Sequence, residues 1–222
     1  MLHASDIIAR VRDLTVDNGQ RKQHWENSEI YNWLKDAQDR IIAQRPYASA
    51  LHGYQHRCTV GSPQRLHDTI AMILNVGFVT DGDTTQALYP IDRRDADAGT
   101  PGWVSERGTP EEYILVEGDK GDPRHFWLLP GPNNLTTVLD LDVAVAPNTI
   151  TSPADELVVS DEWGYTLVDY CMYRMLSKHN KAGNAEPAMA YYRSFLDSIG
   201  QRRSKIEKPP EYEQHPREAN IK

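Results

Sequence analysis

The sequence predicts an α+β protein: a four-helix bundle built from N- and C-terminal helix pairs, a central antiparallel β-rich insert, and an extended C-terminal tail. Three observations predict it. Apolar residues recur at helical spacing near both ends. Glycine and proline punctuate short β-rich runs in the middle. The last residues are charged and contain proline. We expect the boundaries to divide the chain into residues 1–51, 52–153, 154–200 and 201–222.

Two amphipathic helices are predicted in the first part of the chain. Ser5 is a candidate N-cap for the first helix, and an apolar stripe follows it. The second helix begins near Asn27, and Pro46 ends it. Its stripe is the clearest in the chain and consists of Ile30, Trp33, Leu34, Ala37 and Ile41.

The middle of the chain indicates short strands joined by turns. Asp81-Gly82-Asp83 is typical of a hairpin turn. Apolar and polar residues alternate towards the end of this part, as in a half-exposed strand. We expect an antiparallel β-meander with strands at residues 69–76, 112–116, 125–129 and 135–145.

A second helix pair is predicted between residues 154 and 200. Ser160 is a candidate cap for the first helix, Asn184 caps the second, and Gly200 ends it. The two helix pairs most simply pack together as one bundle. On the last helix we expect an inward face of Ala188, Tyr191, Tyr192, Phe195, Leu196 and Ile199.

The tail at residues 201–222 cannot bury a core by itself. It has six Lys and Arg, four Asp and Glu, and three large apolar side chains. Such a segment is typical of one that docks on another chain by strand or extended-segment addition. The candidate interface residues of the tail are Ile206, Tyr212 and Ile221.

Composition argues against several classes of protein. The net charge is −8 over 222 residues, and the 200 residues before the tail carry −10, which argues against a duplex-DNA-binding protein. The longest uncharged apolar stretch, 69–80, is too short to span a bilayer. The charged N-terminus does not resemble a signal peptide. Two cysteines favour a reducing compartment, and we expect no membrane partner.

Candidate metal sites are weak. His52 and His56 stand four residues apart, as two ligands on a helix do, but Gly53 lies between them in a segment typical of strand or loop. The segment beginning at Asp81 resembles the start of a calcium loop. It has Gln86 and Asp92 where that loop requires Gly and a bidentate Glu. We expect no metal and no cofactor.

Candidate catalytic groups are equally weak. Asp140 and Asp142 share one strand face, but alternation with leucines makes that face a solvated one. Cys58 lies near His56 without a third group to orient the pair. The chain has no phosphate-binding glycine loop and no nucleophile elbow. We expect no catalytic residues and no enzymatic activity.

Aromatic residues in the middle of the chain indicate a contact surface. Trp103, Tyr113, Phe126 and Trp127 are candidates for an exposed cluster, and the acidic composition favours a protein interface over a platform for nucleic-acid bases. We expect Trp103 and Trp127 to be interface anchors.

Several segments together resemble one protein family. The segment 27–41, the run Ala87 to Asp97 followed by Pro101-Gly102-Trp103, and 125–132 occur in the same order as in head–tail adaptor, or connector, proteins of tailed bacteriophages. The segments 161–178, 183–186 and 190–192 resemble the C-terminal helical hairpin of that family. The chain is similar to this family over residues 5–200.

The resemblance implies a structural virion protein at the head–tail junction that is assembled in the host cytoplasm. It implies that twelve copies form a ring under the portal protein, extend the DNA channel and present a docking face for tail proteins of the tube or nozzle. DNA would pass through the channel without sequence-specific binding.

Three alternatives remain open at this point: another virion interaction protein, a small hydrolase and a nucleic-acid-binding accessory protein. A concave pocket with convergent titratable groups would favour the hydrolase. Salt-dependent affinity for DNA would favour the accessory protein.

Overall fold

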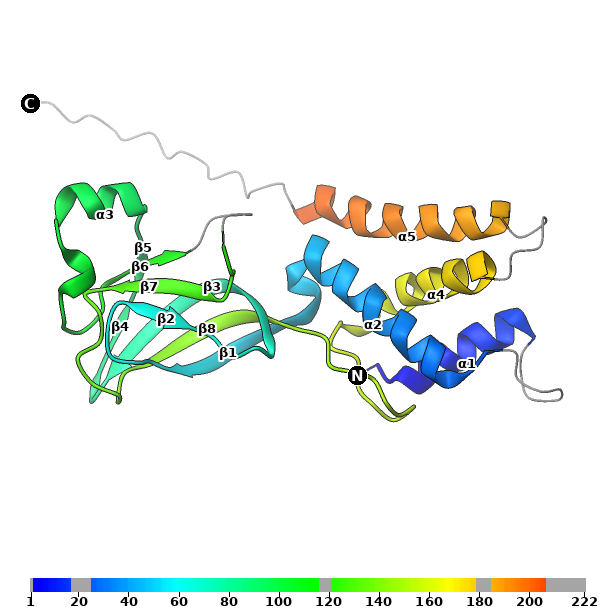
Figure 1. Cartoon of the computed structure of the whole chain (residues 1–222), viewed down its shortest axis with the longest axis horizontal. Coiled ribbons are helices and arrows are strands. Elements are labelled where there is room, and N and C mark those ends of the chain that lie inside the picture. Colours follow the sequence, from blue (N-terminus) through cyan, green and yellow to red (C-terminus); the bar gives the residue numbers. More distant parts are fainter. Residues whose placement is uncertain (1, 17–24, 116–120, 179–184, 207–222) are drawn as a thin grey trace, which may run out of the picture.

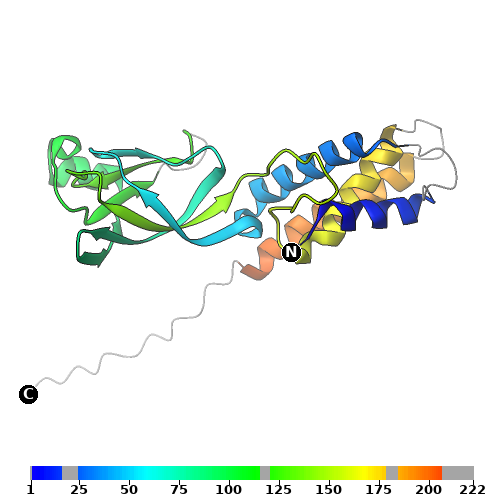
Figure 2. The ribbon, with the colours of Figure 1, turned by 90° about the horizontal axis from the view of Figure 1, so that it is seen from below.

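The computed structural model shows an elongated protein with a helical lobe at one end and a β lobe at the other (Figures 1 and 2). It describes residues 2–16, 25–115, 121–178 and 185–206. The class is α+β: the described residues form five α-helices and two sheets of four strands each.

The helical lobe is built from four α-helices and two 3-10 turns. Its elements are α1 (Ala4–Thr15), α2 (Asn27–Gln44), η1 (Pro46–Ser49), η4 (Asp161–Trp163), α4 (Gly164–Lys178) and α5 (Ala185–Ile206). The predicted stripe of α2 is confirmed, because all five of its residues are buried in the core of this lobe.

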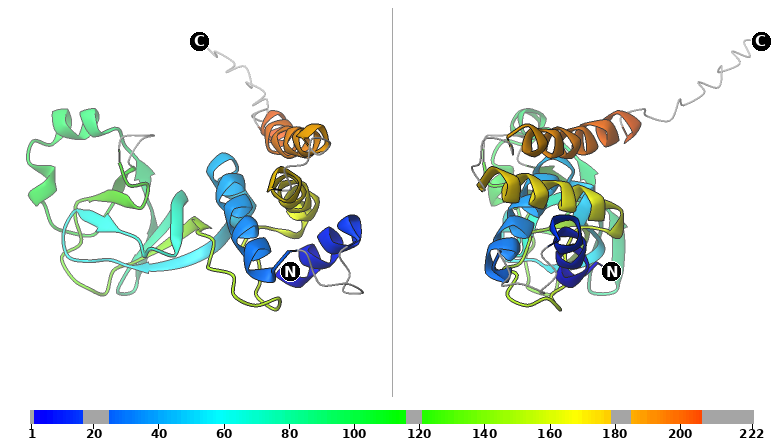
Figure 3. Two further views of the ribbon diagram at one scale, coloured as in Figure 1. Left: turned by 45° about the vertical axis from the view of Figure 1, so that its right-hand side comes forward. Right: turned by 90° about the vertical axis from the view of Figure 1, so that its right-hand side faces the viewer.

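The predicted four-helix bundle is wrong. In such a bundle, the four helices surround a central core, and no helix lies between the others. Here α4 lies in the middle, with α1 and α2 packed on one side and α5 on the other (Figure 3). The physical reason lies in α4, where Thr166 and Met172 are buried on either side of the stripe that contains Leu167 and Cys171, so the buried surface is wider than one narrow stripe. A helix that is apolar over most of its circumference is buried between neighbours on several sides.

The β lobe contains the remaining elements. They are β1 (Ala50–Arg57), β2 (Pro63–Arg65), β3 (Ile70–Asp81), β4 (Thr84–Ala87), β5 (Tyr89–Pro90), α3 (Arg93–Gly99), η2 (Trp103–Ser105), β6 (Glu112–Leu115), β7 (His125–Leu129) and β8 (Val138–Val145). Strand β7 has the predicted bounds, and the Asp81-Gly82-Asp83 turn joins β3 to β4 as predicted.

The predicted β-meander is also wrong. One sheet has the order β1-β8-β3-β4 and the other β2-β7-β6-β5. Three of the six neighbouring pairs, β1–β8, β3–β8 and β2–β7, therefore join strands that are not consecutive in the sequence. All pairs are antiparallel except β5 and β6. Alternation of apolar residues shows which face of a strand is buried, but it does not identify the pairing partner.

A core between the two sheets stabilises the β lobe. Leu139 and Leu141 of β8 come from one sheet, and Phe126 and Leu128 of β7 come from the other; none of the four is measurably exposed. The two lobes therefore have separate apolar cores. Residues 146–160 lead from β8 back to the helical lobe, where Ile150 is buried.

Two helix ends differ from the sequence prediction. His3, not Ser5, is the N-cap of α1, and the Asp6 side chain accepts from the His3 backbone N–H. The predicted C-cap at Gly200 is wrong, because α5 continues through this residue to Ile206. Asn184 lies outside the described residues.

Adjacent residues of α5 provide a test of the layered packing. Phe195 is fully buried against α4, where its ring lies 5.0 Å from that of Tyr170, whereas Leu196 is 44% exposed. We expect Phe195→Ala to lower the free energy of unfolding by about 3–5 kcal/mol, and Leu196→Ala by less than about 1 kcal/mol. Urea denaturation measures both. Equal losses would contradict the placement of α5.

Candidate functional site

The groups considered for metal binding do not converge. The His52 Nδ1 lies 2.8 Å from Asp142 Oδ1, whereas the His56 ring packs edge-on to Phe126 at 5.9 Å between centroids. Burial lowers the pKa of His56. Within the residues that the structure describes, no three His, Cys, Asp or Glu side chains gather as metal ligands.

The candidate catalytic groups have structural partners. Gln55 donates to Asp140 at 2.7 Å, and the hydrogen bond from His52 lowers the pKa of Asp142. Burial raises the pKa of the Cys58 thiol to about 12, so this cysteine is protonated near neutral pH and is a poor nucleophile. Asp140 and Asp142 therefore connect β8 to β1 by side-chain hydrogen bonds.

The two tryptophans predicted as anchors lie in different environments. Trp103 is 2% exposed, and its Nε1 donates to Asp97 at 2.8 Å, so its ring secures α3 within the subunit. Trp127 is half-buried, with the Arg93 guanidinium 5.2 Å from the ring centroid. Of the two rings, only that of Trp127 leaves appreciable surface for a partner. The anchor role of both residues stays a prediction.

The three candidate residues of the tail are not placed. Ile206 is the last residue of α5, and its side chain lies outside the described part of the structure. Tyr212 and Ile221 also lie outside the described residues.

An ion-pair cluster links strand β2 to the residues just before β7. Arg124 donates to both carboxylate oxygens of Asp122, at 2.7 and 2.8 Å, and also to Asp68 at 2.8 Å. Arg65 of β2 donates to Asp68 at 2.7 Å. The hydrogen bonds from Arg124 lower the pKa of Asp122 to about 2. The cluster fixes the start of β7 by charge-assisted hydrogen bonds.

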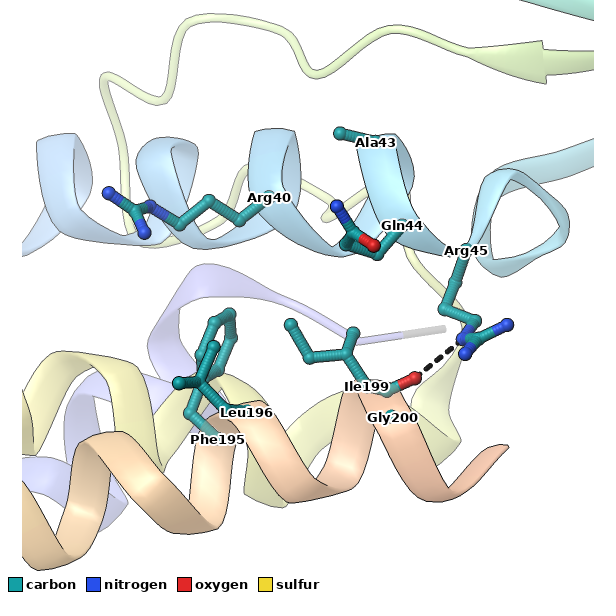
Figure 4. Close-up of a pocket in the computed structure, with 8 residues that line it drawn as sticks. All are labelled: Arg40, Ala43, Gln44, Arg45, Phe195, Leu196, Ile199 and Gly200. Atoms are coloured by element: carbon teal, nitrogen blue, oxygen red, sulfur yellow. Dashed lines mark hydrogen bonds between the residues drawn. The ribbon is translucent and has the colours of Figure 1, made fainter. Parts of the chain in front are cut away.

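A groove in the helical lobe is a candidate binding surface. It lies between the C-terminal end of α2 and the middle of α5 and has a volume of about 280 Å³ (Figure 4). Arg45 closes one end by donating from Nε to the backbone oxygen of Ile199 at 2.6 Å. The lining residues are Arg40, Ala43, Gln44, Arg45, Phe195, Leu196, Ile199 and Gly200.

The groove is apolar inside and basic at its edge. Phe195 and Ile199 are buried, and Leu196 is exposed beside them. The Arg40 guanidinium lies 5.4 Å from the centroid of the Tyr170 ring. The lining of the groove contains two arginines and no carboxylate. This composition suits an apolar protein segment with negative charge nearby, and it does not suit a reaction that needs an acid and a base.

Comparison with known proteins identifies the family. A family profile described as SU10 adaptor protein matches residues 3–214, which is nearly the whole chain. The chain belongs to this family. None of the curated proteins compared with the chain matches it.

Membership in this adaptor family gives the function in outline. The adaptor is a structural component of a phage virion and contacts other virion components. Among the helices that the structure describes, none has the length and apolar character needed to cross a membrane.

The sequence prediction missed the groove of the adaptor. Leu196 was expected to face inward, but it follows Phe195 and is therefore rotated by about 100° around the helix. The spacing of Met189, Arg193, Leu196 and Gly200, three or four residues apart, is the signal that would have shown this exposed stripe.

The Asp122 cluster makes stability depend on pH. The pKa of Asp122 is lowered in the folded protein. The ionised carboxylate therefore contributes fully to the free energy of unfolding above the unfolded pKa near 3.8, and this contribution is lost as pH falls towards 2. We expect Asp122→Asn to be less stable than the wild type at pH 6, with the difference shrinking between pH 4 and 2. Urea denaturation at several pH values measures this.

Asp83→Asn, in the exposed turn between β3 and β4, is the matched control for that experiment. Its stability relative to wild type should change less over the same pH range. A difference for Asp122→Asn that stays constant from pH 6 to 2 would contradict the role of the cluster.

Proposed function

We propose that the chain is a head–tail adaptor: copies of it form a ring under the portal, extend the DNA channel and provide the attachment face for tail proteins of the tube or nozzle. The observation that carries this proposal is the family match over residues 3–214. The elongated two-lobe shape supports it, because a subunit of this shape offers separate surfaces at its two ends and along its sides. A ring of twelve copies at the head–tail junction is the arrangement we infer.

Charge also supports a channel role. The 200 residues before the tail carry a net charge of −10. Carboxylates along a channel wall repel the phosphates of passing DNA, so the DNA moves through without being held. This fits transit without sequence-specific binding.

We assign the contact with the portal to the C-terminal tail of the chain. Residues 201–222 begin inside α5 and end in a charged, proline-containing segment with Tyr212 and Ile221 as its last large apolar groups. An extended segment of this kind adds to an exposed strand edge or lies in a groove of its partner. We infer that the portal is the partner, while Trp127 on the β lobe is a candidate contact for the tail proteins.

Removal of residues 207–222 tests this assignment. We expect a chain of residues 1–206 to stay folded, with an unchanged circular dichroism spectrum, because it retains both cores. Its binding to portal rings of the same phage should fall by at least about tenfold, since the segment that docks is missing. Co-sedimentation with portal rings at a series of concentrations measures the loss.

A full-length chain carrying Tyr212→Ala and Ile221→Ala is the control that separates side-chain contacts from tail length. This variant should also bind portal rings more weakly than the wild type, as the truncated chain does. Undiminished binding of the chain of residues 1–206 would contradict the portal contact of the tail.

A further inference from the structure

The helical lobe exposes two different apolar surfaces on opposite sides of α4. The first, which we name the α5 face, consists of the groove between α2 and α5 together with Met189 and Arg193. The second, which we name the α1 face, lies on α1, η4 and the first turn of α4 and includes Leu14 and Tyr165. Figure 3 shows α5 and α1 on the two sides of α4.

Both faces expose large apolar side chains. Leu196 and Met189 of the α5 face are each 44% exposed, and Leu14 and Tyr165 of the α1 face are 56% and 77% exposed. The Arg10 guanidinium lies 5.3 Å from the centroid of the Tyr165 ring. A cation therefore contacts this exposed ring and restricts its position. Clustered exposed apolar groups beside charged residues are typical of protein contact surfaces.

The two faces differ in the balance of their charges. Arg40 and Arg45 line the groove of the α5 face, and exposed Arg193 lies one turn from Leu196. One exposed carboxylate, that of Asp197, lies beside Arg193 on the same face, so arginines outnumber carboxylates there. The α1 face contains one exposed arginine, Arg10, and several exposed carboxylates. These carboxylates belong to Asp6, Asp13, Asp161 and Glu162. Complementary charge favours contact between unlike faces and disfavours contact between two like faces.

We propose that the α5 face of one copy binds the α1 face of the next, so that this contact closes the ring. The proposal rests on the ring assembly proposed above and names the surface that makes it. Pairing of two α5 faces would bring the arginines of both grooves together without a carboxylate in the groove lining. A contact between two different faces repeats around a rotation axis and generates a ring, whereas a contact between identical faces ends at a dimer.

The groove also has room for a side chain of the neighbour. Ala43 and Gly200 line it, are exposed, and are small, and a Cβ built on Gly200 meets no atom within 4 Å. These two positions therefore leave open the space of about 280 Å³ between α2 and α5. In the proposed contact, Leu14 and Tyr165 of the neighbour are the large apolar side chains available to occupy this space.

Cross-linking of full-length chains tests the contact directly. The natural cysteines, Cys58 and Cys171, are buried, and burial raises the pKa of both thiols, so neither competes for a thiol reagent. The variant carries Leu196→Cys and Leu14→Cys and is treated, in its assembled form, with a short bismaleimide. We expect a ladder of covalent multimers on a denaturing gel, because each copy is joined to two neighbours.

Three comparisons make the result decisive. Each single variant should remain monomeric on the gel, and Leu196→Cys with Leu135→Cys, an exposed position of the β lobe, should give no ladder. Dimers from Leu196→Cys alone would overturn the proposal in favour of symmetric pairing. If mass photometry detected assemblies but the gel showed no ladder, the assignment of the contact to these two faces would be overturned, and the proposed ring would stand. If mass photometry detected only monomers, even after portal rings were added, the proposed ring itself would be contradicted.

Charge reversal provides an independent test of the same contact. We expect Arg193→Glu to raise the apparent dissociation constant of self-association by about threefold to fivefold, and Asp13→Lys to act in the same direction. Together, the two reversals should recover part of the loss, because they restore opposite charges across the contact. Sedimentation velocity measures each constant. Losses that add in the double variant, without recovery, would contradict the pairing of these faces.

Discussion

Burial of α4 on two sides is the interaction on which the helical lobe depends. Tyr170 is 1% exposed, and Cys171 is not measurably exposed. The Tyr170 ring packs 5.0 Å from Phe195 of α5, and α4 also contacts α1 and α2. Because α4 occupies the centre, α5 is separated from α1 and covers only one side of α4. The outer flanks of α5 and α1 are therefore left to solvent, and these flanks are the two faces to which we assign self-association.

The β lobe is a second unit with its own apolar core. Its two sheets bury residues between them, and Trp103 attaches α3 to this lobe from the side. Residues 146–160 return from β8 to the helical lobe, where the backbone N–H of Val158 donates to Gln38 at 2.8 Å. A subunit with two cores joined in this way can form contacts at both ends without loss of either fold. That property suits an adaptor, which contacts more than one virion component.

Local features of the fold were predictable from the sequence, and long-range ones were not. The stripe of α2, the bounds of β7 and the turn at Asp81-Gly82-Asp83 follow from periodicity and turn chemistry over a few residues. Sheet order depends on which strands meet across many residues, and alternation carries no information about that. The central place of α4 was missed because an apolar stripe predicts burial but not the number of neighbours.

Prediction of the candidate surfaces from the sequence was limited in the same way. Of the chemistry-bearing patterns, Cys58 is buried, and the turn at Asp81 joins two strands. The groove was not predicted, because it forms where the C-terminal part of α2 meets α5, and these two helices are far apart in the sequence. Gly200 was interpreted as a helix end, although α5 passes through it and keeps the groove open there.

Electron-microscope class averages of this chain mixed with portal rings of the same phage test the adaptor assignment most directly. The account predicts a second layer of density on one end of the portal, with 12-fold symmetry and a continuous central channel. Portal rings that remain bare at saturating concentrations of the full-length chain would contradict it.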